Sequence, residues 1–155
     1  MKKCLKLLPV LLLSALLLSG CGSTEPLPDG MEEDPLLDAG QAVVDLLIDE
    51  DYQAVYSQFR EDIRAGLTVE DVEALVAPSL AEAGTFESVE ETLVSGSTET
   101  EPHAIAQFTC SFSQREVTFQ TAFDPDLQLI GLAAGARETG WSFSHILDNL
   151  SNFFG

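Results

Sequence analysis

One cysteine near the start of this 155-residue chain lies in a setting that favours covalent modification. Cys21 directly follows Leu18-Ser19-Gly20, and small residues before a cysteine fit the cleavage site of a signal peptidase. The thiolate of a cysteine is a nucleophile, and this one would take a diacylglyceryl group. Residues 1–21 are therefore predicted to be a bacterial lipoprotein signal peptide that ends in the lipobox cysteine.

The segment before Cys21 has the other features of such a signal. Three lysines precede an apolar run, residues 7–18, whose 12 residues would span about 18 Å as a helix. Crossing a bilayer takes about 20 residues, so a transmembrane helix is the poorer interpretation; a cleaved signal without lipid is the other alternative. Two or more acyl chains on Cys21 would anchor the protein stably to the extracytoplasmic face of the cell membrane.

The chain is strongly acidic. It has 7 basic and 26 acidic residues, which give a net charge of −19 at pH 7. Removal of residues 1–20, which precede the lipidated Cys21, would take away all three lysines and no acid, leaving four arginines and a net charge of −22. Because a surface of that sign repels nucleic acid, nucleic-acid binding is excluded.

The other residues that could do chemistry form no catalytic or metal-binding pattern. Cys110 lies in an alternating apolar run, which predicts a buried, inert thiol. His103 and His145 are 42 positions apart, unlike the ligands of a zinc site, and His103 is predicted to be an exposed strand start. Asp124 and Asp126 flank a proline, which favours a turn over a calcium loop. We therefore expect no metal, no cofactor and no enzymatic activity.

The elements that must position these residues begin with helices. Residues 22–35 contain three prolines, two glycines and five acids, which predicts a flexible acidic linker. From Leu36 to residue 48 apolar residues recur at helical spacing. A second stripe covers residues 52–63, and Gly66 is well placed to end that helix.

A third helix is predicted over residues 69–80. Thr68 and Asp71 have the spacing of a capping box at its start, although Glu is more typical than Asp in that motif. Pro78 is expected to kink or restart the helix because its ring prevents the regular hydrogen-bond pattern.

After Gly84 the apolar period changes from 3.6 residues to two, the period of a strand. The clearest strand places Ala106, Phe108 and Cys110 on one face. Short connections between the last three strands favour antiparallel hairpins. Helices followed by strands indicate an α+β fold, with N-terminal helices packed on one face of a curved, mainly antiparallel four-stranded sheet. The predicted strands are residues 86–94, 103–113, 116–123 and 127–133.

The end of the chain predicts a short amphipathic helix. Its polar side carries no Lys or Arg, and Ser142 is a candidate N-cap. Three uses of the apolar side remain open: docking on its own sheet, binding a partner or second copy, and lying on the membrane. That face consists of Phe143, Ile146, Leu147, Leu150, Phe153 and Phe154. The chain is thus divided into residues 1–21 (signal), 22–35 (linker), 36–135 (domain) and 136–155 (C-terminal helix).

Several strings in the domain resemble a bacterial family. They are VVDLL, DEDY and AVYSQF within residues 42–67, FTCSF at 108–112 and FDPDLQLIGL at 123–132. In these the chain is similar to a domain of unknown function, of the DUF3887 type, found in secreted lipoproteins and ahead of α/β-hydrolase domains. The resemblance implies a cone-shaped fold like that of nuclear transport factor 2, and it brings no catalytic residues. No G-x-S-x-G motif of a hydrolase is present.

Folds of this cone type often hold a pocket between helices and sheet. The side chains that would line it are Tyr52, Tyr56, Phe59, Phe108 and Phe119, together with Phe112 and Phe123. The alternative is that these aromatics fill the core, because a domain of about 100 residues without disulfides needs them for stability.

Arg60 and Arg64 are one helical turn apart, a mildly repulsive pair. Ion pairs with nearby acids are the expected arrangement, and a grip on an anionic ligand is the alternative. Together these observations predict a lipid-anchored protein with a non-enzymatic binding or assembly domain and an unknown protein partner. Small-ligand binding in the cone pocket is the second function to be considered.

Overall fold

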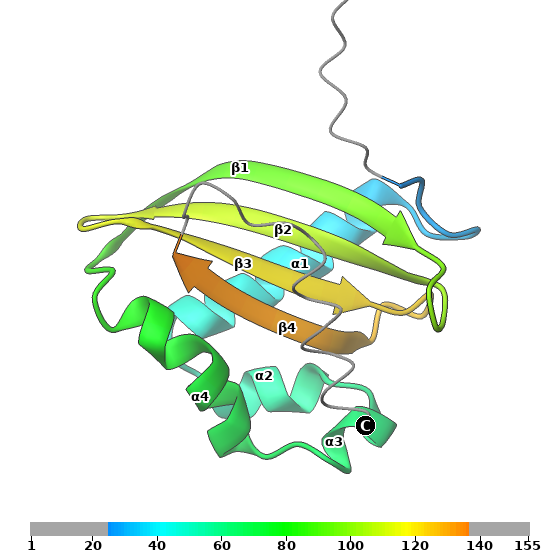
Figure 1. Ribbon diagram of the computed structural model, residues 1–155, viewed down its shortest axis with the longest axis horizontal. Coiled ribbons are helices and arrows are strands. Elements are labelled where there is room, and N and C mark those ends of the chain that lie inside the picture. The colour runs from blue at the N-terminus through cyan, green and yellow to red at the C-terminus, as the bar shows by residue number, and fades with distance from the viewer. Residues whose placement is uncertain (1–24, 137–155) are drawn as a thin grey trace, which may run out of the picture.

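The computed structural model describes residues 25–136 as helices followed by a sheet (Figure 1). The α+β fold predicted from the sequence is therefore confirmed, and the predicted C-terminal helix lies outside the described residues. In chain order the elements are α1 (Glu33–Ile48), α2 (Tyr52–Gln58), α3 (Glu61–Arg64), α4 (Val69–Leu80), β1 (Phe86–Ser97), β2 (His103–Phe112), β3 (Glu116–Phe123) and β4 (Leu129–Ala136).

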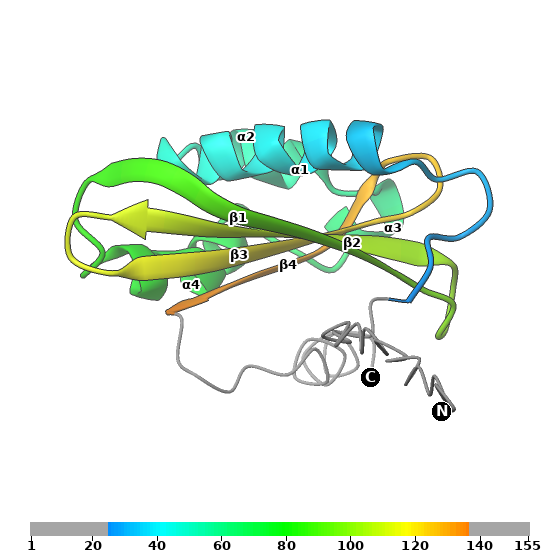
Figure 2. The ribbon, with the colours of Figure 1, turned by 90° about the horizontal axis from the view of Figure 1, so that it is seen from above.

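The sheet is an antiparallel meander with strand order β1-β2-β3-β4. Helix α1 runs across one face and contacts β1, β2 and β3, while α4 contacts β4 (Figure 2). Phe108 of β2 and Phe119 of β3 are directly opposite each other in the register, and both are fully buried. The core therefore lies between α1 and the middle of the sheet, as the alternating pattern of the sequence requires.

Gly40 sets how closely α1 approaches the sheet. A Cβ at this position would lie 2.6 Å from Cε2 of Phe108 and 3.1 Å from Oγ1 of Thr121. No ordinary van der Waals contact is that short, so the helix packs at this distance only because the residue has no side chain. Gly40 is thus a close-packing position between α1 and the sheet.

Cys110 is on the same face of β2 and is fully buried. Burial, reinforced by the negative charge of Asp45, raises the pKa of its thiol to about 11. The predicted burial of Cys110 is therefore confirmed; a thiol that is protonated at neutral pH is consistent with the expected inert cysteine, which stays a prediction.

Helix α4 begins as predicted. The side chain of Thr68 accepts a hydrogen bond from the backbone N–H of Asp71, whose carboxylate accepts one from the backbone N–H of Thr68. This reciprocal arrangement is a capping box. The expectation of a restart at Pro78 is wrong, because the helix continues through it to Leu80.

The second predicted helix is interrupted. Helix α2 ends at Gln58, and Phe59 is extended, with φ −64° and ψ 142°. Phe59 forms a parallel bridge with Leu129, and the N–H of Arg60 donates to the carbonyl oxygen of Leu129 at 2.9 Å. Pairing with the edge of β4 therefore replaces helical bonds, and residues 52–63 form two helices instead of one.

The segment predicted as a flexible linker, residues 22–35, packs on the domain in its described part. Glu25 accepts a hydrogen bond from the N–H of Gly96 at 2.9 Å, and Met31 is buried in the core. A Cβ on Gly96 would lie 2.0 Å from the carbonyl oxygen of Pro26, so the two backbones touch at a glycine. The folded domain thus begins near Glu25, about ten residues earlier than predicted.

Candidate functional site

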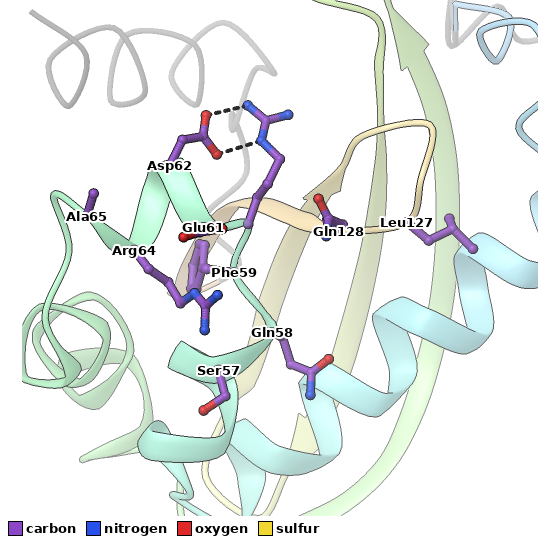
Figure 3. Close-up of a pocket in the computed structure, with 10 residues that line it drawn as sticks. Ser57, Gln58, Phe59, Glu61, Asp62, Arg64, Ala65, Leu127 and Gln128 are labelled. Atoms are coloured by element: carbon purple, nitrogen blue, oxygen red, sulfur yellow. Dashed lines mark hydrogen bonds and ion pairs between the residues drawn. The ribbon is translucent and has the colours of Figure 1, made fainter.

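A shallow open pocket lies where α2 gives way to α3, facing the loop between β3 and β4 (Figure 3). Its volume is about 870 Å³. The lining mixes two arginines, two acids, neutral polar residues and a few apolar side chains. These residues are Ser57, Gln58, Phe59, Arg60, Glu61, Asp62, Arg64, Ala65, Leu127 and Gln128.

Two local features of the chain shape this pocket. The first is the extended break at Phe59, which turns α3 away from α2. The second is the tight turn after β3, in which Oδ1 of Asp124 accepts from the N–H of Asp126 at 3.0 Å and of Gln128 at 2.9 Å. This is the turn chemistry predicted for the Asp-Pro-Asp sequence. Leu127 completes the turn with a φ of +57°, which is strained for a residue with a side chain.

Arg60 is held on one side of the pocket by three carboxylates. Its Nε and Nη2 donate to the two oxygens of Asp62 at 2.7 and 2.9 Å, drawn as dashed lines in Figure 3. It also donates to Glu101 at 3.1 and 3.2 Å and to Asp124 at 3.1 Å. These bonds raise the pKa of Arg60, and the Arg60 guanidinium lowers the pKa of Asp62. The prediction of ion pairs is confirmed for this arginine.

Arg64 is in the opposite situation. No carboxylate of residues 25–136 forms an ion pair with it, and its Nε is buried without a hydrogen-bond partner in that part of the chain. Its backbone is fixed, because the hydroxyl of Tyr56 donates to the Arg64 carbonyl oxygen at 3.3 Å. The expectation of ion pairs is therefore not met at Arg64 within the described residues.

His103 differs from its prediction. It is 5% exposed, although an exposed strand start was expected. Its Nδ1 is 2.8 Å from the carbonyl oxygen of Glu101, so the side chain folds back over the chain just before β2. The proline before it indicated a strand start correctly, but not which side of the sheet edge the ring would occupy.

Most of the aromatic residues proposed for a cone pocket do not line the open pocket. Of the five, Phe59 lines the pocket of Figure 3, at 5% exposure. Phe108 and Phe119 are fully buried in the core, and Tyr52 and Tyr56 are partly buried against it. Burial raises the pKa of Tyr52, with Glu50 adding to the effect.

Two groups of predicted site residues fall outside the part that the structure describes. These are the lipobox Cys21 and the apolar face from Phe143 to Phe154. Within residues 25–136, no three His, Cys, Asp or Glu side chains form a group suited to a metal ion. No helix in the same range is long and apolar enough to cross a membrane.

Sequence reasoning missed several residues of the pocket. Ser57, Gln58, Leu127 and Gln128 carry no pattern of their own, since each is an ordinary residue next to an interruption in a helix or strand. The available signals were the two arginines one turn apart and the Asp-Pro-Asp turn. Nothing in the spacing indicated that these two segments meet.

The chain belongs to a known family. Residues 40–132 match the family model described as "Protein of unknown function (DUF3887)". The fold is similar to that of the "NMR structure of protein from Ruminococcus gnavus ATCC 29149", with a TM-score of 0.61 and 18% sequence identity. That likeness covers 71% of this chain and 96% of the other, and it concerns the fold alone. A search of curated proteins gave no match.

Proposed function

We propose that this DUF3887 member is a lipid-anchored extracytoplasmic protein whose folded domain is a non-enzymatic binding module. The observation that carries the proposal is the lipobox Leu18-Ser19-Gly20-Cys21, placed directly ahead of the domain. The packing of α1 across a meandering sheet supports the finer assignment to a cone similar to nuclear transport factor 2.

The packed segment at Glu25 gives the anchor a short tether. If Cys21 carries the lipid, residues 22–24 separate it from the first packed residue, and fully extended chain over that stretch spans at most roughly 14 Å. The carbonyl oxygen of Glu25 accepts a hydrogen bond from the N–H of Gly96, near the end of β1. The loop between β1 and β2 would therefore stay close to the lipid head groups, unlike the far end of the sheet.

The surroundings of Cys110 and Arg60 support binding over catalysis. The Cys110 thiol is buried with a pKa of about 11, so it is a poor nucleophile at neutral pH. Arg60 is occupied by three carboxylates and has little freedom to contact a substrate.

Acylation is tested by replacing Cys21 with serine in cells grown with radiolabelled palmitate. We expect the wild-type protein to incorporate label and to partition into Triton X-114, and Cys21→Ser to lose both properties. Cys110→Ser is the matched control, because a buried thiol outside the lipobox should have no effect on either. Label retained by Cys21→Ser would refute the lipid anchor.

The short tether is tested with a fluorophore on either end of the sheet. Thr100→Cys lies in the loop between β1 and β2, and Gln114→Cys lies in the hairpin roughly 30 Å away along β2. In vesicles with a head-group quencher, we expect much stronger quenching at residue 100 than at residue 114. Equal quenching at both positions would mean that the domain moves freely on a longer tether.

Small-ligand binding is the second candidate, favoured by the open pocket and by Arg64, which has no ion-pair partner within residues 25–136. Native mass spectrometry of the purified protein tests it without a guess at the ligand. A bound small molecule that is lost on denaturation would support this use, and a protein of bare mass would favour a protein partner.

A further inference from the structure

We propose that Arg64 is the anion-binding residue of the pocket and that it takes the carboxylate of a small organic acid. This inference rests on the proposed binding function and specifies the ligand class of the pocket in Figure 3. Neither the family match nor the related fold assigns a ligand to it.

The charge distribution around Arg64 is the first argument. Residues 25–136 carry 24 acidic side chains and three arginines, so an arginine without an acidic partner is unexpected in this domain. Arg60 pairs with three carboxylates, and Arg115 is 3.8 Å from Glu82 and donates to the carbonyl oxygen of Ser79 at 2.7 Å. Arg64 has no such partner among these residues, so no carboxylate of residues 25–136 neutralises its charge.

The geometry of the pocket is the second argument. Figure 3 shows the Arg64 side chain extending from α3 past the ring of Phe59 toward Ser57 of α2. The guanidinium therefore lies among the residues that line the pocket. Its Nε is buried without a hydrogen-bond partner in the described chain, a condition that costs stability unless another group satisfies it. A ligand that binds the terminal nitrogens of Arg64 and moves the side chain toward solvent would expose Nε to water. The loss of stability caused by the unpartnered Nε would then disappear.

The chemistry of the lining selects among anions. A guanidinium presents its donors as a planar fork, which matches the two oxygens of a carboxylate. Glu61 and Asp62 also line the pocket, and they repel each additional negative charge on a ligand. A monoanionic carboxylate therefore fits better than a phosphate dianion.

The rim of the pocket favours a ligand with an apolar part. Leu127 is 37% exposed and lines the pocket, although its φ of +57° would suit glycine or asparagine better. The strained turn thus presents an aliphatic side chain to solvent at the edge of the site. Ala65 adds a second small apolar contact on the side of α3.

The probe for this site is propionate, with propionamide as its neutral isostere and inorganic phosphate as the dianion. Backbone amide shifts of the full-length protein in nanodiscs report binding. We expect propionate to shift amides of residues 57–65 and 127–128 in a saturable way, and propionamide to bind at least about tenfold more weakly. Phosphate that binds as well as propionate would overturn the carboxylate assignment.

Two substitutions attribute the effect to Arg64. Arg64→Gln should weaken propionate binding at least about tenfold, and Arg64→Lys should recover part of the loss because it restores the charge. Arg115→Gln is the matched control, since it removes an arginine at a distance from the pocket and should leave the propionate affinity unchanged. Unchanged affinity in Arg64→Gln, checked to be folded by its melting temperature, would overturn the proposal. That result would leave acylation of Cys21 standing, because it is measured separately.

Discussion

Two regions of the molecule differ in the kind of residue that forms them: the core between α1 and the sheet, and the pocket beside α3. The core contains the large aromatics Phe108 and Phe119, at 1% and 0% exposure, and Gly40 brings the helix into contact with them. The pocket lies where a helix is interrupted, and charged and polar residues line most of it. In this fold Phe108 and Phe119 fill the core, whereas an interruption of the regular chain leaves an open pocket.

Truncation of a core side chain should lower the free energy of unfolding more than any change at the pocket. Phe119→Ala removes a fully buried ring, and we expect it to lower the free energy of unfolding by about 3–5 kcal/mol. Urea denaturation followed by circular dichroism measures this loss. A cost below about 1 kcal/mol would mean that the aromatics enclose space instead of filling it.

Filling the close contact at Gly40 should be the next most damaging change. In Gly40→Ala the new Cβ meets Phe108 at 2.6 Å, and overpacking of this kind costs about 1–3 kcal/mol. Gly66→Ala is the matched control, because the nearest atom to its Cβ is 3.9 Å away. Equal urea midpoints for the two variants would contradict the close packing of α1.

The ion pair on the Arg60 side of the pocket should matter less. Asp124→Asn keeps the acceptor oxygen that closes the turn and removes the charge that faces Arg60. Because Arg60 retains Asp62 and Glu101, we expect a loss of about 1 kcal/mol in the free energy of unfolding. Asp126→Asn, at an exposed neighbouring position, should change stability little. A loss as large as that of Phe119→Ala would show that the pocket is as critical to folding as the core.

Replacement of Arg64 should have the smallest effect on stability. With no ion pair to lose within the described residues, Arg64→Gln should lower the free energy of unfolding by less than about 0.5 kcal/mol. The same variant should lose the affinity for propionate. A drop in melting temperature as large as that of Asp124→Asn would indicate a structural role for Arg64 and would remove the contrast between the two arginines.

Local patterns in the sequence predicted most elements of the fold. The capping box at Thr68 and the strand over residues 116–123 depend on neighbours within a few positions, and the structure has both. The break at Phe59 could not be predicted in this way. It depends on a bridge to Leu129, 70 positions along the chain, which overrides the helical stripe.

The candidate site was less predictable than the fold for the same physical reason. The spacing of Arg60 and Arg64 marked both residues as candidates. The acidic partners that Arg60 has and Arg64 lacks within residues 25–136 include residues distant in sequence. Glu101 and Asp124 are 41 and 64 positions from Arg60. Which of the two arginines has carboxylate partners among residues 25–136 thus depends on the tertiary structure.

The order of the strands in the sheet has a consequence for how the chain acquires its structure. Since each strand pairs with the next one along the chain, every hairpin closes a short loop, and the entropic cost of forming the sheet stays low. The chain can therefore build its sheet by successive local steps, without waiting for distant segments. Stopped-flow refolding should show a single rapid phase for this domain, and a slow dominant phase would contradict such an assembly route.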